Sequence, residues 1–258
     1  MRRHLKYVLA STPLHSALIE PHRRRTKRAT LFKPVVISTH HKTGTAWLGK
    51  IFRALCCYHK IPYSYYKKTS LTNEVVFDQH SRAQAQPDNF RGVHLIRNPK
   101  EMICSGLNYH RVTKETWAHI KQKKYGGKSY QEFLNSVSIE DGIFAEIERS
   151  SSAVKAMHDW DYTDPRYIEV KYEDLMSDHD LKIFFSIFSH LHMPGETLGT
   201  ALELSWYGSI FGGRIKKTDH ITSGRLSVHG QYFSEEHHSF FHELYGSVCA
   251  DLGYSETE

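Results

Sequence analysis

Residues 34–52 (PVVISTHHKTGTAWLGKIF) constrain the fold of this chain more than any other segment. Residues 35–39 form a short β-branched run that predicts a buried strand, and the apolar side chains from Trp47 onward recur at helical spacing. The loop between them contains Gly44. Such loops in α/β proteins bind phosphate groups, because the loop amides and the helix N-terminus attract anions. The segment therefore predicts an α/β domain with an anion site at the loop.

The position of the lysine separates two kinds of phosphate loop. A Walker loop has the form GxxxxGK[ST], in which the lysine follows the last glycine. In this chain Lys42 precedes Gly44. The loop lacks the order typical of nucleoside-triphosphate binding, which favours a different phosphorylated ligand.

A second segment, residues 92–110 (GVHLIRNPKEMICSGLNYH), repeats the pattern of a strand that runs into a helix. Asn98 is a favoured N-cap, Pro99 suits the first helical position, and Glu101 stands where a capping box requires an acidic residue. Arg97 therefore leaves the strand at the N-terminus of a helix. That position is suited to a second anion.

Strand-like segments alternate with helical ones along the chain. Further strands are expected at 75–78 and 166–171, and helices across 114–158, at 180–192 and from Ser234 onward. This alternation predicts a central parallel sheet flanked by helices, with the ligand beyond the carboxyl ends of the strands. The residues expected just past strand ends, and so in one shared site, are Lys42, His80, Arg97 and Tyr172.

Two motifs resemble those of the sulfotransferases that use 3′-phosphoadenosine 5′-phosphosulfate (PAPS). KTGTAW at residues 42–47 resembles their phosphosulfate loop, usually written PKSGTTW. RNPKEMICS at residues 97–105 resembles their 3′-phosphate motif, RNPKDxxxS, and keeps the spacing from Arg97 to Ser105. Both motifs point to the same donor.

Three further segments resemble family motifs in the expected order. SYQEFL at 129–134 is similar to an acceptor-side segment written SFEEFL, YEDL at 172–175 to RYEDL, and SGRLSVHGQYF at 223–233 to the late loop RKGxxGDW. The resemblance covers about residues 34–254. The departures are Ala46 in place of a second threonine, Ser227 in place of a glycine, and Gln231 and Tyr232 in place of Asp-Trp.

The resemblance implies a P-loop-like nucleotide-binding fold, with PAPS as co-substrate and 3′,5′-adenosine bisphosphate (PAP) as product. It implies that Trp47 and Trp206 sandwich the adenine, that Tyr172 reaches its edge, and that the late loop with Arg225 covers the 3′-phosphate. The residues assigned in this way to the donor are Lys42, Thr43, Gly44, Thr45, Ala46, Trp47, Arg97, Ser105, Tyr172, Trp206, Arg225 and Gly230.

Sulfuryl transfer needs a base for the acceptor proton and a cation beside the leaving phosphate. Lys42 would be that cation, and the amides of residues 43–45 would hold the 5′-phosphate. The resemblance places the catalytic base at the end of the strand before the RNPK strand, where His80 stands. An imidazole with a pKa near ~6.5 can accept a proton at physiological pH. Glu74 and Asp78 flank the same strand and are the alternative bases.

Length and composition limit the remaining choices. The 258 residues fit one catalytic domain, residues 34–258, after a basic arm, residues 1–33. This arm would pack on the domain or touch an anionic surface, or it is a solvated tail or ordered extension with no chemical role. No run of 18 apolar residues predicts a membrane span, and no CxxC or HExxH spacing predicts a metal site. Four cysteines without a disulfide framework indicate a reducing, cytoplasmic location.

Two other classes of function remain open. A P-loop kinase of a small hydroxyl compound would need a Mg²⁺-binding Ser or Thr after the lysine, a role that Thr43 meets in part. A non-enzymatic nucleic-acid-binding protein would use the net charge of +6, but no known binding module is present. We expect PAPS and a hydroxyl-bearing acceptor as partners, and no nucleic acid. The acceptor could be a small molecule, a lipid or a glycan.

Overall fold

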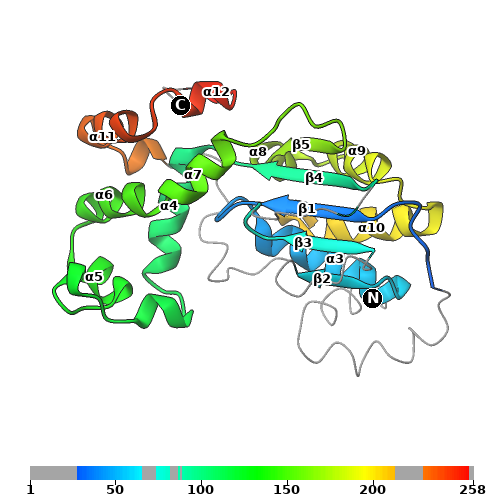
Figure 1. The fold of residues 1–258 in the computed structure, drawn as a ribbon, viewed down its shortest axis with the longest axis horizontal. Helices are drawn as coiled ribbons and strands as arrows, with labels where there is room; N and C mark the ends of the chain where they lie inside the picture. The colour runs from blue at the N-terminus through cyan, green and yellow to red at the C-terminus, as the bar shows by residue number, and fades with distance from the viewer. Residues whose placement is uncertain (1–27, 66–73, 82–86, 88, 213–228, 256–258) are drawn as a thin grey trace. The chain divides into compact units, whose positions relative to one another are not determined.

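The structure is a computed structural model that describes residues 28–65, 74–81, 87, 89–212 and 229–255 (Figure 1). The chain forms two compact units. The first is built from described residues up to Ile96 and from 161 to 212, and the second from 97–160 and 229–255. The proposed boundary between residues 33 and 34 stays a prediction, since residues 1–27 of the arm lie outside the described residues.

Within the described residues, the first unit contains a five-stranded sheet of order β2-β3-β1-β4-β5, in which every neighbouring pair is parallel (Figure 1). The strands are β1 (Val35–Thr39), β2 (Tyr63–Tyr65), β3 (Val75–Asp78), β4 (Arg91–Ile96) and β5 (Tyr167–Lys171). The helices are α3 (Thr45–His59), α8 (Tyr172–Ser177), α9 (Lys182–His190) and α10 (Gly195–Gly208), with a 3₁₀ turn η4 (Ile210–Gly212). The predicted α/β class with a central parallel sheet is confirmed.

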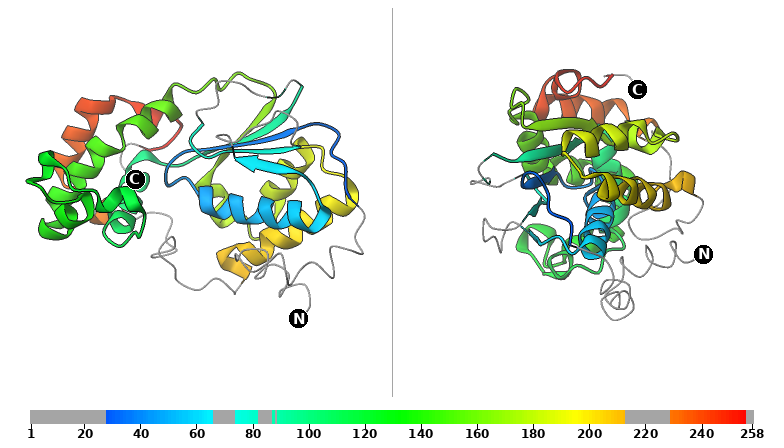
Figure 2. Two further views of the ribbon diagram at one scale, coloured as in Figure 1. Left: turned by 60° about the horizontal axis from the view of Figure 1, so that its bottom comes forward. Right: turned by 90° about the vertical axis from the view of Figure 1, so that its right-hand side faces the viewer.

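One face of this sheet carries the main apolar core. Ile37 of β1 packs in one cluster with Ile51 and Phe52 of α3, Phe188 of α9 and Ala201 of α10, and each is at most 2% exposed. Helices α3 and α10 lie side by side on this face (Figure 2). Burial of each large apolar side chain stabilises the fold by about 1.5–3 kcal/mol. The core thereby fixes the start of α3 and the loop before it.

Three elements of the first unit were not predicted from the sequence: β2, the short helix α8 and α10. Strand β2 has only three residues, and its Tyr65 ring stacks on Phe77 of β3 with centroids 5.2 Å apart. Helix α10 follows Pro194, and its Leu204 and Ala201 join the core of α3. Both β2 and α10 depend on partners that are distant in sequence.

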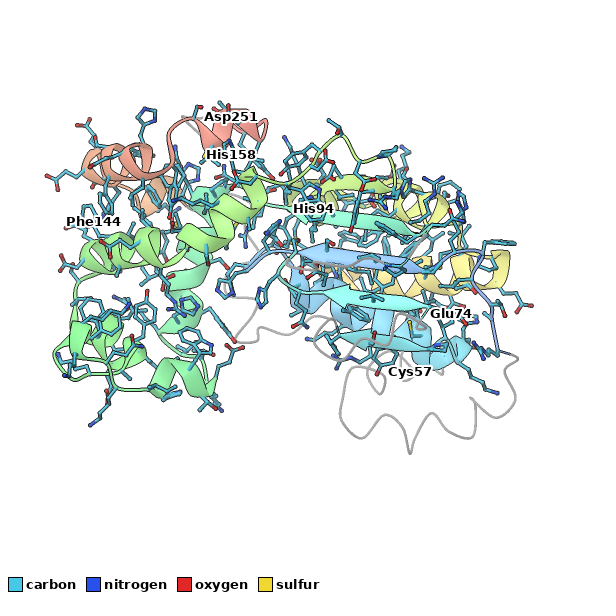
Figure 3. The ribbon with its side chains drawn as sticks, viewed as in Figure 1. Cys57, Glu74, His94, Phe144, His158 and Asp251 are labelled. Atoms are coloured by element: carbon cyan, nitrogen blue, oxygen red, sulfur yellow. The ribbon has the colours of Figure 1, made fainter. Side chains whose placement is uncertain are left out.

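The second unit is helical. Its elements are α4 (Pro99–His110), η2 (Thr116–His119), η3 (Lys123–Tyr125), α5 (Tyr130–Ser136), α6 (Ile139–Arg149), α7 (Ser151–His158), η5 (His229–Gln231), α11 (Glu235–Tyr245) and α12 (Val248–Asp251). Long-range contacts join them: the rings of Phe144 and His237 are 4.3 Å apart, and His158 Nε2 lies 3.1 Å from Asp251 Oδ2 (Figure 3). Glu146 is buried and accepts hydrogen bonds from His110 and Tyr130.

Candidate functional site

The loop between β1 and α3 is held in shape by its own threonines. The carbonyl oxygen of His40 accepts from the hydroxyl of Thr43 at 3.0 Å and from that of Thr45 at 2.9 Å. The His40 N–H donates to Thr43 Oγ1 at 2.9 Å, and Thr43 is fully buried. These hydroxyls therefore stabilise the loop itself.

The backbone of this loop presents amides at the start of α3. Lys42 and Gly44 have positive φ values of 63° and 99°. The Thr43 N–H donates to the His40 carbonyl at 3.3 Å, but no backbone carbonyl of the described residues accepts from Gly44, Thr45 or Ala46. Glycine as the N-cap brings no side chain to occupy those amides. This leaves an N-terminus of a 15-residue helix with donors available to an anion.

Two of the predicted adenine contacts lie against this loop. A Cβ at Gly44 would come within 2.9 Å of the Tyr172 ring, so Tyr172 covers the glycine closely. The Trp47 ring meets Tyr172 and Phe184 edge-on, with centroids 6.0 and 5.7 Å apart. Its Nε1 is buried and has no hydrogen-bond partner among the described residues. The loop between β1 and α3 thus forms one cluster with Trp47 and Tyr172.

Trp206 belongs to another part of the first unit. It lies near the end of α10, is 39% exposed, and has its ring 5.3 Å from that of Phe211. Its pairing with Trp47 around an adenine stays a prediction.

His80 lies in the turn after β3, and this turn is tied to the end of β1. The Thr39 hydroxyl donates to the carbonyl of Gln79 at 3.2 Å, and the Ser81 hydroxyl donates to the carbonyl of Thr39 at 3.0 Å. Thr39 Oγ1 is also 2.9 Å from Thr45 Oγ1 in the loop. His80 itself is exposed. The structure therefore brings the predicted base into a turn bonded to the predicted donor loop.

The two alternative bases lie at opposite ends of β3. Glu74 precedes the strand, where it pairs with Arg28 at 2.5 Å and accepts from the Leu31 N–H at 3.2 Å (Figure 3). Asp78 ends the strand, is 2% exposed, and stands opposite Ser38 of β1. Four residues of strand span about 13 Å. Glu74 is thus at the amino edge of the sheet, whereas Asp78 is at the carboxyl edge.

The second unit joins two of the predicted motifs around α4. Asn98 caps this helix as expected, since its Oδ1 accepts from the Lys100 N–H at 2.9 Å. Glu101, expected in a capping box, has a different use: its Oε1 accepts from the N–H and Nδ1 of His229, at 2.8 and 2.7 Å. Glu101 Oε2 also lies 4.0 Å from the Arg97 guanidinium. The RNPK motif thereby contacts the late loop.

The same face of α4 extends this contact. Tyr232 places its hydroxyl 3.3 Å from the Asn108 side-chain amide nitrogen. Ser105 lies on that face too, because residues 101, 105 and 108 are spaced by helical turns. Ser105 is half-buried and Gly230 is exposed. Arg225 and Ser227 lie outside the described residues.

A buried polar group that the sequence interpretation missed lies beside the loop. His94 Nε2 is 2.7 Å from His40 Nε2, and its Nδ1 is 2.5 Å from Glu169 Oε2. His40 and His94 are at most 1% exposed (Figure 3 labels His94). Burial lowers the pKa of His94 to about 3, against a smaller opposing effect of Asp78. The signal in the sequence was a histidine inside the apolar strand GVHLI.

The described residues also limit other kinds of site. They contain no group of three His, Cys, Asp or Glu side chains arranged to hold a metal ion. No helix among them combines the length and the apolar character needed to cross a bilayer.

Comparison with known proteins finds similarity in structure and none in sequence. The chain is similar to the mouse sulfotransferase SULT7A1 complexed with PAP, with a TM-score of 0.52 and 13% identity. The match covers 90% of this chain and 88% of that chain. No protein-family model and no curated protein matches. Similarity at this level of identity shows a shared sulfotransferase-like α/β fold.

Proposed function

We propose that this chain is a PAPS-dependent sulfotransferase that transfers a sulfuryl group to a hydroxyl or amine of an acceptor. The observation that carries the proposal is the loop at residues 42–47. It has the residue order of a phosphosulfate loop, and its backbone presents amides at the N-terminus of α3. The fold shared with a PAP-complexed sulfotransferase supports the same donor.

The predicted donor residues have distinct roles in this proposal. Lys42 stabilises the charge that develops on the leaving phosphate. The amides of residues 44–46 hold the 5′-phosphate, in place of the predicted 43–45, because the Thr43 N–H donates to the His40 carbonyl. Arg97 and Ser105 bind the 3′-phosphate together with the late loop of Arg225 and Gly230. Trp47, Tyr172 and Trp206 bind the adenine.

His80 acts as the general base. It removes the proton of the acceptor hydroxyl as the oxygen attacks sulfur, and the bond from sulfur to the 5′-phosphate breaks. The turn that carries it is bonded to Thr39 at the start of the loop, which supports this choice. Asp78 is the second candidate, because it lies at the same edge of the sheet.

The partners of this reaction are PAPS and a hydroxyl-bearing small molecule, lipid or glycan, and we infer a cytoplasmic location. No disulfide joins the four cysteines, which supports a reducing compartment.

Ligand-induced thermal stabilisation tests the donor. PAP should raise the unfolding temperature of the full chain, whereas ATP with Mg²⁺ and a DNA oligomer should not. Arg97→Ala should weaken PAP binding by roughly 10- to 100-fold, since a charged contact contributes about 1.5–3 kcal/mol. Stabilisation by ATP with Mg²⁺ alone would favour the kinase, and stabilisation by DNA alone the nucleic-acid-binding protein. A screen of acceptors with radiolabelled PAPS then identifies the substrate.

A further inference from the structure

On the face opposite the main core, one row of side chains is polar across four neighbouring strands, from β3 to β5. Asp78 of β3, Ser38 of β1, His94 of β4 and Glu169 of β5 are successive partners in the parallel register. The first three are at most 2% exposed. Buried polar side chains in the middle of a parallel sheet are costly unless they are fully hydrogen-bonded, so this row calls for an explanation.

Donor and acceptor can be assigned in the two hydrogen bonds that join Glu169, His94 and His40. The carboxylate of Glu169 can only accept, so His94 donates its Nδ1–H to it at 2.5 Å. Burial keeps the pKa of His94 low, and the neutral ring then has an unprotonated Nε2. That nitrogen must accept from the Nε2–H of His40 at 2.7 Å. Glu169 and His94 together fix the tautomer of His40.

His40 is also the residue on which the donor loop is built. Its carbonyl oxygen and its N–H make hydrogen bonds with Thr43, and the carbonyl accepts from Thr45 as well. His40 lies two residues after Ser38 of the polar row, and its ring contacts the ring of His94. The residue whose ring contacts His94 is therefore also the residue whose backbone groups hold Thr43 and Thr45 in the loop.

We propose that His94 and Glu169 are positioning residues for the donor loop, which act through the ring of His40 to hold the amides of residues 44–46 in their anion-binding arrangement. The proposal rests on the proposed function for the identity of the anion. The groups that face His94 include, besides His40 and Glu169, Asp78 and the ring of Tyr162, whose centroid is 5.9 Å away.

Substitutions at Glu169 provide the sharpest test, because this side chain is 28% exposed and the variants should fold. Glu169→Leu removes the acceptor of the His94 Nδ1–H and should weaken PAP binding by roughly 10-fold, because a buried donor is left without its hydrogen bond. Glu169→Gln keeps an acceptor oxygen without charge, and should bind PAP within about 3-fold of wild type. Glu243→Leu, at an exposed carboxylate of α11, is the matched control and should bind as wild type.

The hydrogen-bond chain is observed directly by NMR of the full chain labelled with ¹⁵N-histidine. Wild type and Glu169→Gln should show His94 protonated at Nδ1 and His40 at Nε2, with His94→Gln and His40→Gln identifying the signals. In Glu169→Leu both tautomers should become mixed, and the amide signals of Gly44 and Thr45 should shift. A folded Glu169→Leu that binds PAP as wild type would overturn the proposal, as would equal losses in the Leu and Gln variants.

The two proposals fail in different ways. Absence of PAP binding by wild type would remove the sulfotransferase assignment. The tautomers and the Gly44 and Thr45 shifts would then still decide whether the pair positions the loop: unchanged shifts in Glu169→Leu would contradict it.

Discussion

Gly44 is a position where the backbone and the space around it both require glycine. Its φ of 99° lies in the left-handed region, and an added Cβ would come within 2.9 Å of the Tyr172 ring and 3.2 Å of Leu95. The same residue belongs to the proposed donor loop and is the N-cap of α3. Fold and proposed chemistry therefore depend on one residue.

Gly44→Ala should destabilise the protein by about 1–3 kcal/mol in urea unfolding, because alanine is strained at this φ and contacts the ring. It should also weaken PAP binding. Gly49→Ala is the matched control: Gly49 lies inside α3 with nothing within 4 Å of an added Cβ. That change should stabilise the protein by about 0.5–1 kcal/mol. A Gly44→Ala variant as stable as wild type would show that the loop conformation is not required.

The choice of base is also decided at single residues. His80→Ala should leave PAP affinity nearly unchanged and lower turnover by about 10²–10⁴-fold. The wild-type rate should fall as the pH drops through the imidazole pKa, since a protonated ring accepts no proton. Asp78→Asn and Glu74→Gln, which keep shape and remove charge, are the comparisons. Loss of turnover in Asp78→Asn with an active His80→Ala would identify a carboxylate base.

At the scale of an element, α4 carries the RNPK motif and is buried on nearly all sides. Its Lys100 and Glu101 are each 2% exposed, so the helix has no solvated face along its first turn. Asn98 satisfies one of its terminal amides, and Glu101 satisfies two donors of His229. Asn98 thus caps the start of α4, and the Glu101 carboxylate connects α4 to His229 of the late loop.

Loss of the Asn98 cap and loss of the Glu101–His229 contact should lower the free energy of unfolding by different amounts. Asn98→Ala should cost about 1 kcal/mol, as expected for an N-cap. Glu101→Ala should cost more, about 3 kcal/mol or above, because two hydrogen bonds to a carboxylate are lost and buried donors remain. Hydrogen exchange at the His229 amide should accelerate only in the Glu101 variant. An equal loss of unfolding free energy in the two variants would mean that the Glu101–His229 contact contributes little to stability.

At the scale of the molecule, the polar row makes stability depend on pH. His94 is neutral when folded, with a pKa lowered by burial to about 3, but titrates near ~6.5 when unfolded. The unfolded chain therefore binds a proton that the folded one does not. Stability is complete above the unfolded pKa and falls as pH decreases toward 3, by about 1.4 kcal/mol per unit.

Urea unfolding at pH 7.5 and 5 measures this effect. His94→Gln should lose less stability than wild type between these values, by about 2 kcal/mol. His242→Gln, at an exposed histidine of α11, should keep the dependence of wild type. An unchanged dependence in His94→Gln would mean that His94 is already protonated in the folded protein.

Local sequence patterns were enough to predict the elements that form for local reasons. Runs of β-branched residues and helical spacing predicted β1, β3, β4 and α3, and the Asn98-Pro99 pair predicted the start of α4. The same local order placed a glycine-containing loop, the proposed donor loop, at the end of β1.

Contacts between residues distant in sequence became known from the tertiary structure alone. Strand β2 pairs with β3, and α10 packs against α3. Glu101 accepts hydrogen bonds from His229 where a capping box was expected, and Glu74 and Asp78 lie at opposite ends of β3. The tertiary structure also brings His40, His94 and Glu169 together across three elements. A local sequence pattern indicates which face of a helix or strand is apolar. Hydrogen bonds between buried polar side chains depend instead on the register of neighbouring strands, and no local sequence signal encodes that register.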